Sequence, residues 1–270
     1  MAPTDRKKPP VRWKNRTRLL AACGLIVVGG LLVWRTGLAR RVDSNALWRV
    51  VHNLCVPDEV SNHSPAPCVA VDLAKGYAVL RDERGATQVL VIPTAKVTGL
   101  EDPAVLKPDA PNYWEDAWDA RGYVAQLAHR PIPRDDIGLA INSLYGRSQN
   151  QLHIHIDCLD PYAKRELDAA LGRIGPAWID RVHIRYRDYR ALWIPEASLA
   201  TTNLFRRAVE GDPAARRDMT RETLALLPAT LPTGAPGFAL LEDRAGIGYE
   251  GHAENLLDHK CHALTGDVFY

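Results

Sequence analysis

Residues 142–158 read NSLYGRSQNQLHIHIDC and hold the most informative stretch of the chain. In its second half, apolar residues alternate with polar ones: Leu152, Ile154 and Ile156 stand between Gln151, His153, His155 and Asp157. A period of two is typical of a β-strand with one face in the core. We therefore expect a strand from which His153 and His155 project on the same side, with Cα atoms about 7 Å apart.

Two histidines on one rigid strand suit two kinds of chemistry. Neutral ring nitrogens bind metal ions, and an imidazole can also act as a nucleophile, acid or base near neutral pH. The preceding polar turn favours the second kind, because it can offer phosphate oxygens the Arg147 guanidinium, the Ser148 hydroxyl and backbone N–H groups. Asn142, at the end of the previous expected strand, would face the same cleft.

The flanking sequence predicts an α+β domain with a largely antiparallel sheet. Apolar and β-branched runs indicate strands at 77–80, 88–92, 137–141, 151–158, 182–186 and 238–242. Helical spacing indicates helices at 47–54, 113–129 and 161–174, and an interrupted helical pattern over 203–227.

The N-terminal region predicts a membrane segment. Residues 19–34 contain no charge and lie between Arg18 and Arg35. With the residues to 38 they approach the roughly 17–25 residues that span a bilayer. We expect an uncleaved signal-anchor at 19–38, and a cleaved signal peptide is the alternative.

The distribution of charge orients that segment. Residues 1–18 hold seven Lys and Arg residues and one acid, whereas the rest of the chain sums to −4. Positive charge stays on the cytoplasmic side, so we expect a cytoplasmic tail at 1–18 and an exported domain at 42–270. An acidic body also argues against a nucleic-acid partner.

The cysteines fit export. Cys55, Cys68, Cys158 and Cys261 all follow the apolar segment, and disulfides persist outside the cytoplasm. Three pairings are possible. In one of them Cys55–Cys68 closes a short loop and Cys158–Cys261 ties the middle of the chain to its C-terminal end; four reduced thiols are the alternative.

The central motif resembles the histidine-triad superfamily, whose signature is His-φ-His-φ-His-φ-φ with φ apolar. The exported body as a whole resembles the CDP-diacylglycerol pyrophosphatase family of bacterial inner membranes. The shared features are the N-terminal anchor, Asn142-Ser143, Gly146-Arg147, Gln149-Asn150, His153-Ile154-His155-Ile156, Cys158 and Asp258-His259-x-Cys261.

This resemblance implies a histidine-triad-like fold and a periplasmic hydrolase that cleaves CDP-diacylglycerol into phosphatidate and CMP. By position, His153 is the nucleophile and His155 orients or protonates. Asn142, Arg147, Ser148 and Gln151 would contact the substrate, with Gln151 replacing the first histidine of the triad. The resemblance implies neither a metal nor a cofactor, and the substrate is a lipid-nucleotide at the inner membrane.

Two other functions agree with the same residues. One is a histidine-triad-like hydrolase or transferase of another nucleotide. The other is a non-catalytic exported module that binds a metal or a partner through His153 and His155.

Overall fold

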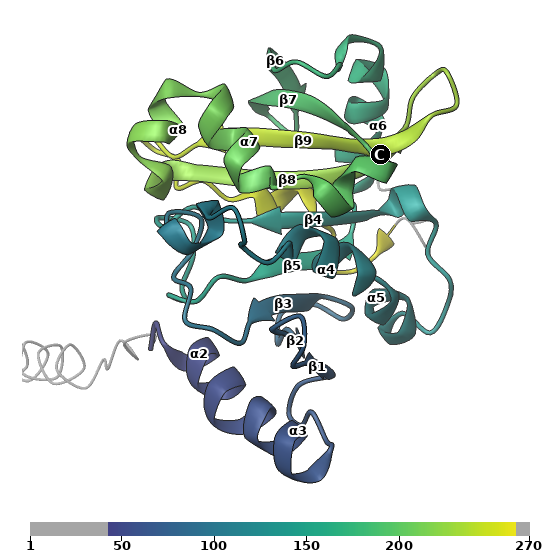
Figure 1. Cartoon of the computed structure of the whole chain (residues 1–270). Helices are drawn as coiled ribbons and strands as arrows, with labels where there is room; N and C mark the ends of the chain where they lie inside the picture. Colours follow the sequence, from purple (N-terminus) through teal and green to yellow (C-terminus); the bar gives the residue numbers. More distant parts are fainter. Residues whose placement is uncertain (1–42, 263–270) are drawn as a thin grey trace, which may run out of the picture. The chain divides into compact units, whose positions relative to one another are not determined.

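The computed structural model describes residues 43–262 (Figure 1). The expected cytoplasmic tail at 1–18 and membrane segment at 19–38 lie outside the described residues. Within 43–262, no helix is both long enough and apolar enough to cross a membrane.

A single nine-stranded sheet organises the described chain, in the order β1-β2-β3-β5-β4-β8-β9-β7-β6. Every paired neighbour runs antiparallel, as predicted. The strands are β1 (Ala70–Asp72), β2 (Tyr77–Arg81), β3 (Val89–Pro93), β4 (Ile137–Ile141), β5 (Ile154–Cys158), β6 (Ile179–Ile184), β7 (Arg187–Pro195), β8 (Glu222–Thr230) and β9 (Pro236–Arg244).

Short helices accompany the sheet, which gives the expected α+β class. They are α2 (Ala46–Val50), continued through a π-turn to α3 (Val56–Asn62), then α4 (Tyr113–Asp119), α5 (Gly122–Leu127), α6 (Pro161–Ala170), α7 (Leu204–Gly211) and α8 (Pro213–Arg217). Several begin at side-chain caps that satisfy free backbone N–H groups; Asp160, for example, accepts from Tyr162 and Ala163 at the start of α6.

Some elements differ from the sequence-based expectation. The helical pattern over 203–227 ends at Arg217, and β8 begins at Glu222. A run of Leu and Ala is apolar in either conformation, and the central place of β8 between β4 and β9 makes it a strand. The long helix expected over 113–129 is two helices separated near Ala120, and β5 begins only at Ile154.

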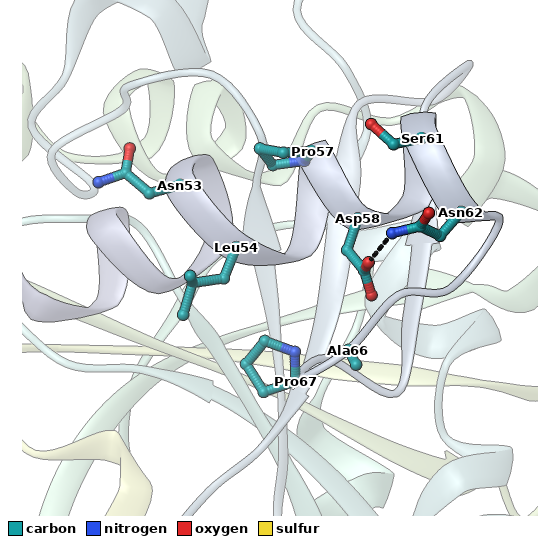
Figure 2. Close-up of a pocket in the computed structure, with 8 residues that line it drawn as sticks. All are labelled: Asn53, Leu54, Pro57, Asp58, Ser61, Asn62, Ala66 and Pro67. Atoms are coloured by element: carbon teal, nitrogen blue, oxygen red, sulfur yellow. Dashed lines mark hydrogen bonds between the residues drawn. The ribbon is translucent and has the colours of Figure 1, made fainter.

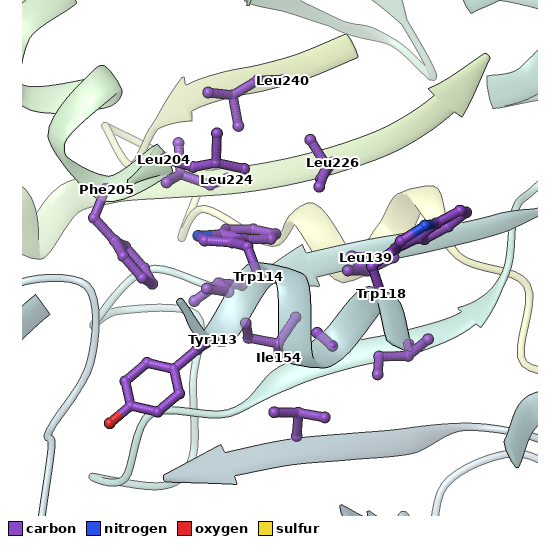
Figure 3. Packing of buried hydrophobic residues seen from close by; sticks show 14 of the residues in the cluster. Tyr113, Trp114, Trp118, Leu139, Ile154, Leu204, Phe205, Leu224, Leu226 and Leu240 are labelled. Carbon is purple, nitrogen blue, oxygen red and sulfur yellow. The ribbon is translucent and has the colours of Figure 1, made fainter. Parts of the chain in front are cut away.

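One face of the sheet carries the main apolar core. Trp114 and Trp118 of α4 lie on Ile154, Leu139 and neighbouring residues of the central strands, and Phe205 of α7 packs beside them (Figure 3). Trp114 is fully buried. These aromatic side chains therefore serve the core and do not face the histidines.

The opposite face carries the polar side chains of β5. His155 lies beside Leu90 of β3 and Ala140 of β4 in the register. Leu90 packs in the cluster under α2, and Ala140 in the one under α6. The alternation in 151–158 thus places Ile154 and Ile156 in one core and the histidines on the other side of the sheet.

Candidate active site

A cavity of about 440 Å³ lies on the histidine-bearing face. Its walls come from α2, from the turn that follows β2, from the 146–149 turn and from the C-terminal segment near Glu254. His153 and His155 both line it, and their ring centroids are 4.9 Å apart. The expected projection of both histidines from one face is confirmed.

A second hollow, of about 590 Å³, lies along α3 (Figure 2). Asp58 is the one titratable side chain among the residues that line it, and this carboxylate accepts a hydrogen bond from Asn62. The hollow contains no histidine or cysteine side chain. Its one hydroxyl, that of Ser61, has no histidine among the lining residues to activate it, and we therefore place the chemistry in the smaller cavity.

His153 is held in the form that a nucleophile needs. Its Nδ1 lies 2.7 Å from the backbone carbonyl oxygen of Gln151. A carbonyl only accepts, so Nδ1 carries the proton and Nε2 keeps a lone pair. Burial lowers the pKa of His153 below its ordinary value, which keeps the ring neutral at neutral pH.

The Nδ1 side of the His155 ring faces Gln88 and Glu254. Its Nδ1 is 2.7 Å from the amide Nε2 of Gln88 and 3.4 Å from a carboxylate oxygen of Glu254. Among the described residues, its Nε2 has no hydrogen-bond partner although it is buried. Burial lowers the pKa of His155 to about 3, so this ring is also neutral.

Glu254 is fixed by Asn142. The Asn142 amide donates to Glu254 Oε2 at 2.9 Å, and the Glu254 backbone N–H donates to Asn142 Oδ1 at 3.1 Å. Burial opposes ionisation of Glu254, but its pKa is lowered overall because the Asn142 and Gln88 amides donate to its carboxylate and the His259 imidazole faces it. Asn142 thus lines the cavity as predicted, but both polar atoms of its side chain contact Glu254.

The 146–149 turn is packed against the C-terminal segment. A Cβ at Gly146 would lie 2.6 Å from the Gly251 carbonyl oxygen, so only glycine fits this close approach. Arg147 makes two bonds to Glu101, at 2.7 and 2.6 Å, and still lines the cavity. Ser148 is exposed at the cavity and is free of the core.

Gln151 differs from its predicted role. Its side chain is fully buried and does not line the cavity. The amide donates to the carbonyl oxygens of Pro93 and Ala95, at 2.9 and 2.8 Å. The side chain therefore locks the segment after β3 in place, and only the backbone carbonyl of Gln151 reaches the site, through His153.

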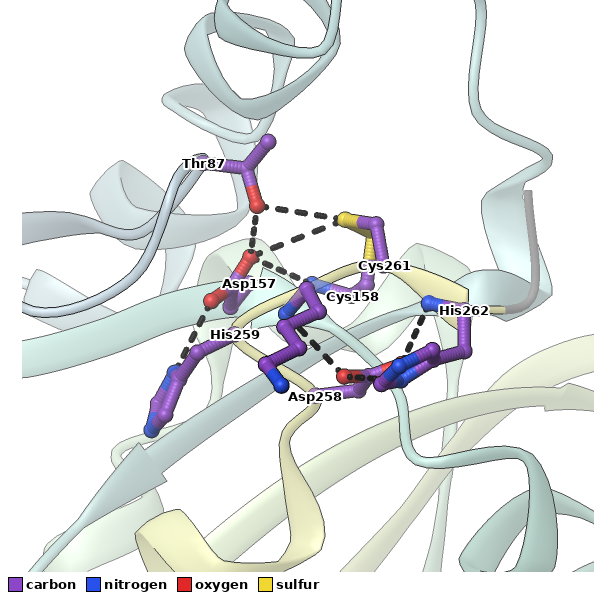
Figure 4. The surroundings of a disulfide bond; sticks show 8 residues. Thr87, Asp157, Cys158, Asp258, His259, Cys261 and His262 are labelled. Carbon is purple, nitrogen blue, oxygen red and sulfur yellow. Dashed lines mark hydrogen bonds and ion pairs between the residues drawn. A yellow bond between two sulfur atoms is a disulfide. The ribbon is translucent and has the colours of Figure 1, made fainter. Parts of the chain in front are cut away.

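The structure contains the Cys55–Cys68 and Cys158–Cys261 disulfides. Near the second disulfide, His259 points toward Asp157 (Figure 4). His259 Nδ1 lies 3.0 Å from Asp157, and Nε2 lies 3.5 Å from Glu254. The hydrogen bond to Asp157 raises the pKa of His259.

One group of residues could offer ligands to a metal ion. Donor atoms of Asp82, His155 and Glu254 lie within 4.8 Å of one another. The amide nitrogen of Gln88 already stands among them, 2.8 Å from Asp82 and 3.2 Å from Glu254. An amide donor thus fills the place that a cation would take. Asp157 also approaches Cys158 and Cys261, but a disulfide offers no thiolate.

Sequence reasoning missed the residues behind His155, namely Gln88, Asp82 and Glu254. No spacing in the sequence connects them with the central motif, because Asp82 follows β2, Gln88 directly precedes β3 and Glu254 lies in the C-terminal segment. His259 was signalled by its place two residues before Cys261.

Comparisons with known proteins show the family of the chain. The profile of the CDP-diacylglycerol pyrophosphatase family matches residues 42–265. The CDP-diacylglycerol pyrophosphatase of Yersinia pestis is 36% identical over 257 residues, which are 94% of this chain and 96% of that protein. The protein is thus an enzyme, a hydrolase that acts on a diphosphate bond. Within that class, the chain belongs to the CDP-diacylglycerol pyrophosphatase family.

Proposed function

We propose that the protein hydrolyses CDP-diacylglycerol to phosphatidate and CMP through a cytidylyl intermediate on His153. The observation that carries this proposal is the state of His153, a buried neutral imidazole with a proton on Nδ1 and a lone pair on Nε2 at the cavity. Family membership supplies the substrate class.

The first step exchanges one bond for another. His153 Nε2 attacks the phosphorus next to cytidine, and the P–O bond to the phosphate of phosphatidate breaks with the electron pair on the leaving oxygen. Phosphatidate leaves easily because it is a phosphomonoester anion. The carbonyl of Gln151 stabilises the positive charge that develops on the His153 ring.

Water completes the cycle. Its oxygen forms a bond to phosphorus, the P–N bond breaks, and the electron pair returns to His153 Nε2 as CMP leaves, while the proton that the water loses passes to the solvent. Phosphoryl transfer depends mainly on positioning and on neutralising oxygen charge. Ser148 and the imidazole of His155, whose Nε2 has no partner among the described residues, stand at the cavity for that purpose.

The same proposal includes the context of the enzyme. Residues 19–38 anchor the chain in the bacterial inner membrane with 1–18 in the cytoplasm, and the exported domain from 42 onward meets its lipid substrate at the bilayer. The domain adopts a histidine-triad-like fold. The antiparallel strands around His153 support that relationship, and the charge asymmetry of the sequence supports the orientation.

The test is CMP release from CDP-diacylglycerol in detergent micelles containing EDTA. We expect the wild type to release CMP and His153→Ala to lose at least about 10³-fold of that rate. The matched control is His183→Ala, which changes an exposed histidine on β6. Equal rates for wild type and His153→Ala would rule out the covalent intermediate.

A second arm separates the alternative substrates. Soluble CDP-alcohols offered under the same conditions should be cleaved much more slowly than the lipid. Faster cleavage of a soluble nucleotide would support the alternative function, a hydrolase or transferase of another nucleotide. A bound metal ion without any turnover would support the non-catalytic module.

A further inference from the structure

The tautomer of His155 is determined by its neighbour Gln88. The two groups meet at 2.7 Å, between Nδ1 of the imidazole and Nε2 of the amide. An amide nitrogen only donates, so His155 Nδ1 must accept. The single proton of the neutral ring is then on Nε2, the buried atom that has no partner among residues 43–262.

Two carboxylates decide which end of the Gln88 amide faces His155. Asp82 Oδ2 lies 2.8 Å from Gln88 Nε2, and Glu254 Oε1 lies 3.2 Å from it. Either carboxylate would repel the amide oxygen if the group were turned over. Of the two carboxylates, Glu254 is the more buried, with an exposed fraction of 8%. Solvent therefore weakens its electrostatic effect on the Gln88 amide less than that of Asp82.

Glu254 itself is held by Asn142 and His259. The Asn142 side chain donates to the Glu254 carboxylate and accepts from the Glu254 backbone N–H. His259 approaches its carboxylate at 3.5 Å and is anchored in turn on Asp157. Since His259 is two residues from Cys261, the Cys158–Cys261 disulfide keeps this support in place.

We propose that Glu254 is a positioning residue which, through the Gln88 amide, keeps the proton of His155 on Nε2 and so directs an N–H group at the phosphoryl oxygens of the bound substrate. This inference rests on the proposed function for the identity of the group that the N–H meets. The arrangement of Glu254, Gln88 and His155 exists without substrate and can be tested without it.

The direct test is the ¹⁵N NMR spectrum of the full chain, labelled on histidine and held in detergent micelles without substrate. The chain contains nine histidines, and comparison with His155→Gln identifies the resonances of His155. We expect a protonated Nε2 and an unprotonated Nδ1 in the wild type. A wild-type ring protonated on Nδ1 would overturn the proposal.

Two isosteric variants test the cause. Glu254→Gln replaces the buried carboxylate with an amide and weakens the preference for the Gln88 amino group, which Asp82 alone then supports from its more exposed position. Gln88→Glu places a carboxylate oxygen against His155 Nδ1. Because a carboxylate accepts hydrogen bonds, it favours a proton on Nδ1. We expect both to move the His155 proton toward Nδ1 and to lower kcat by about 10²-fold, the scale of a mispositioned acid–base group.

The matched control is Glu210→Gln, the same chemical change at an exposed site on α7. It should keep the wild-type His155 spectrum and the wild-type kcat. Retention of the Nε2–H form in both isosteric variants would overturn the role of Glu254 and Gln88. Should Glu254→Gln not fold, Gln88→Glu and the wild-type spectrum still decide the question.

Failure of this inference can be told apart from failure of the proposed function. A wild type that does not cleave CDP-diacylglycerol but shows His155 protonated on Nε2 contradicts the function and leaves the positioning by Glu254 supported. A wild type that cleaves the lipid but carries the proton on Nδ1 contradicts the positioning alone.

Discussion

The carboxylate of Glu254 lies 3.4 Å from Nδ1 of His155, although the two residues are far apart in the sequence. This contact joins the C-terminal segment to β5. The same carboxylate bonds Asn142 at the end of β4. The site therefore depends on three separate parts of the chain, and changes at the residues that join them should affect stability and catalysis together.

Asn142→Asp should disrupt this junction. The variant sets a second carboxylate against buried Glu254, and one buried charge loses its compensation. We expect the free energy of unfolding to fall by about 3 kcal/mol, and the rate of CMP release to fall by at least about tenfold.

Urea denaturation and the CMP assay measure the two effects. The matched control is Asn62→Asp, in which the new carboxylate also faces an aspartate, Asp58, but at an exposed site. Its free energy of unfolding should change by less than about 0.5 kcal/mol. Equal destabilisation by the two variants would contradict the buried junction.

The two disulfides should differ in what they protect. Cys158–Cys261 closes a loop with a sequence separation of 103, and Cys55–Cys68 one of 13. Chain entropy predicts losses of about 4.7 and 3 kcal/mol when each bond is removed. The comparison uses two double Cys→Ser variants, one for each disulfide. Their free energies of unfolding are measured by urea denaturation after the samples have reached equilibrium.

Activity separates the disulfides further. His259, which lies beside Glu254, is two residues from Cys261 of the Cys158–Cys261 disulfide. The Cys55–Cys68 disulfide instead belongs to the apolar cluster under α2 and α3. We expect the Cys158→Ser and Cys261→Ser pair to lower kcat more than the Cys55→Ser and Cys68→Ser pair, at temperatures where both are folded. The opposite order would show that His259 does not support the site.

Acid should destabilise the protein through the two site histidines. Burial lowers the pKa of both His153 and His155, so the unfolded chain takes up these protons first as pH falls. The free energy of unfolding should therefore fall below about pH 6.5, where an ordinary histidine titrates, and continue toward the lower folded pKa values.

Urea denaturation at pH 7.5 and pH 5 measures that slope. His153→Gln and His155→Gln should each reduce the stability difference between the two pH values, and His183→Gln, at an exposed site, should retain it. An unchanged difference in both site variants would contradict burial of neutral imidazoles.

Arg84 should contribute to substrate capture. It is exposed, lines the cavity from the turn after β2, and its charge acts on His155. A solvated guanidinium beside a phosphate is worth about 1 kcal/mol or less. We expect Arg84→Ala to raise KM by about threefold to fivefold at low salt with little change in kcat.

Salt and a matched variant check this assignment. Added NaCl should reduce the difference between wild type and Arg84→Ala, because it screens exposed charges. Arg216→Ala, at an exposed position on α8, should keep the wild-type KM. A fall in kcat without a change in KM would instead make Arg84 part of the chemical step.

Local pattern was sufficient to predict much of the fold. The alternation over 151–158 identified the face that carries His153 and His155, and the apolar runs at 77–80, 88–92 and 137–141 became β2, β3 and β4. The pattern over 203–227 failed as a helix in its second half. An apolar run is compatible with strand or helix, and only the neighbours of β8 decide between them.

The sequence by itself determined which chemical groups are available, namely two imidazoles on one polar face of a strand and a polar turn that can receive phosphate oxygens. Only the tertiary structure decided the protonation and the partners of these groups. The Gln151 carbonyl fixes the proton of His153, Glu254 and Gln88 surround His155, and the Gln151 side chain turns away from the cavity. A tautomer depends on which atoms lie within about 3 Å of a ring nitrogen. For His153 that atom belongs to the next residue but one, whereas for His155 only folding brings Gln88 to the ring from a distant part of the chain.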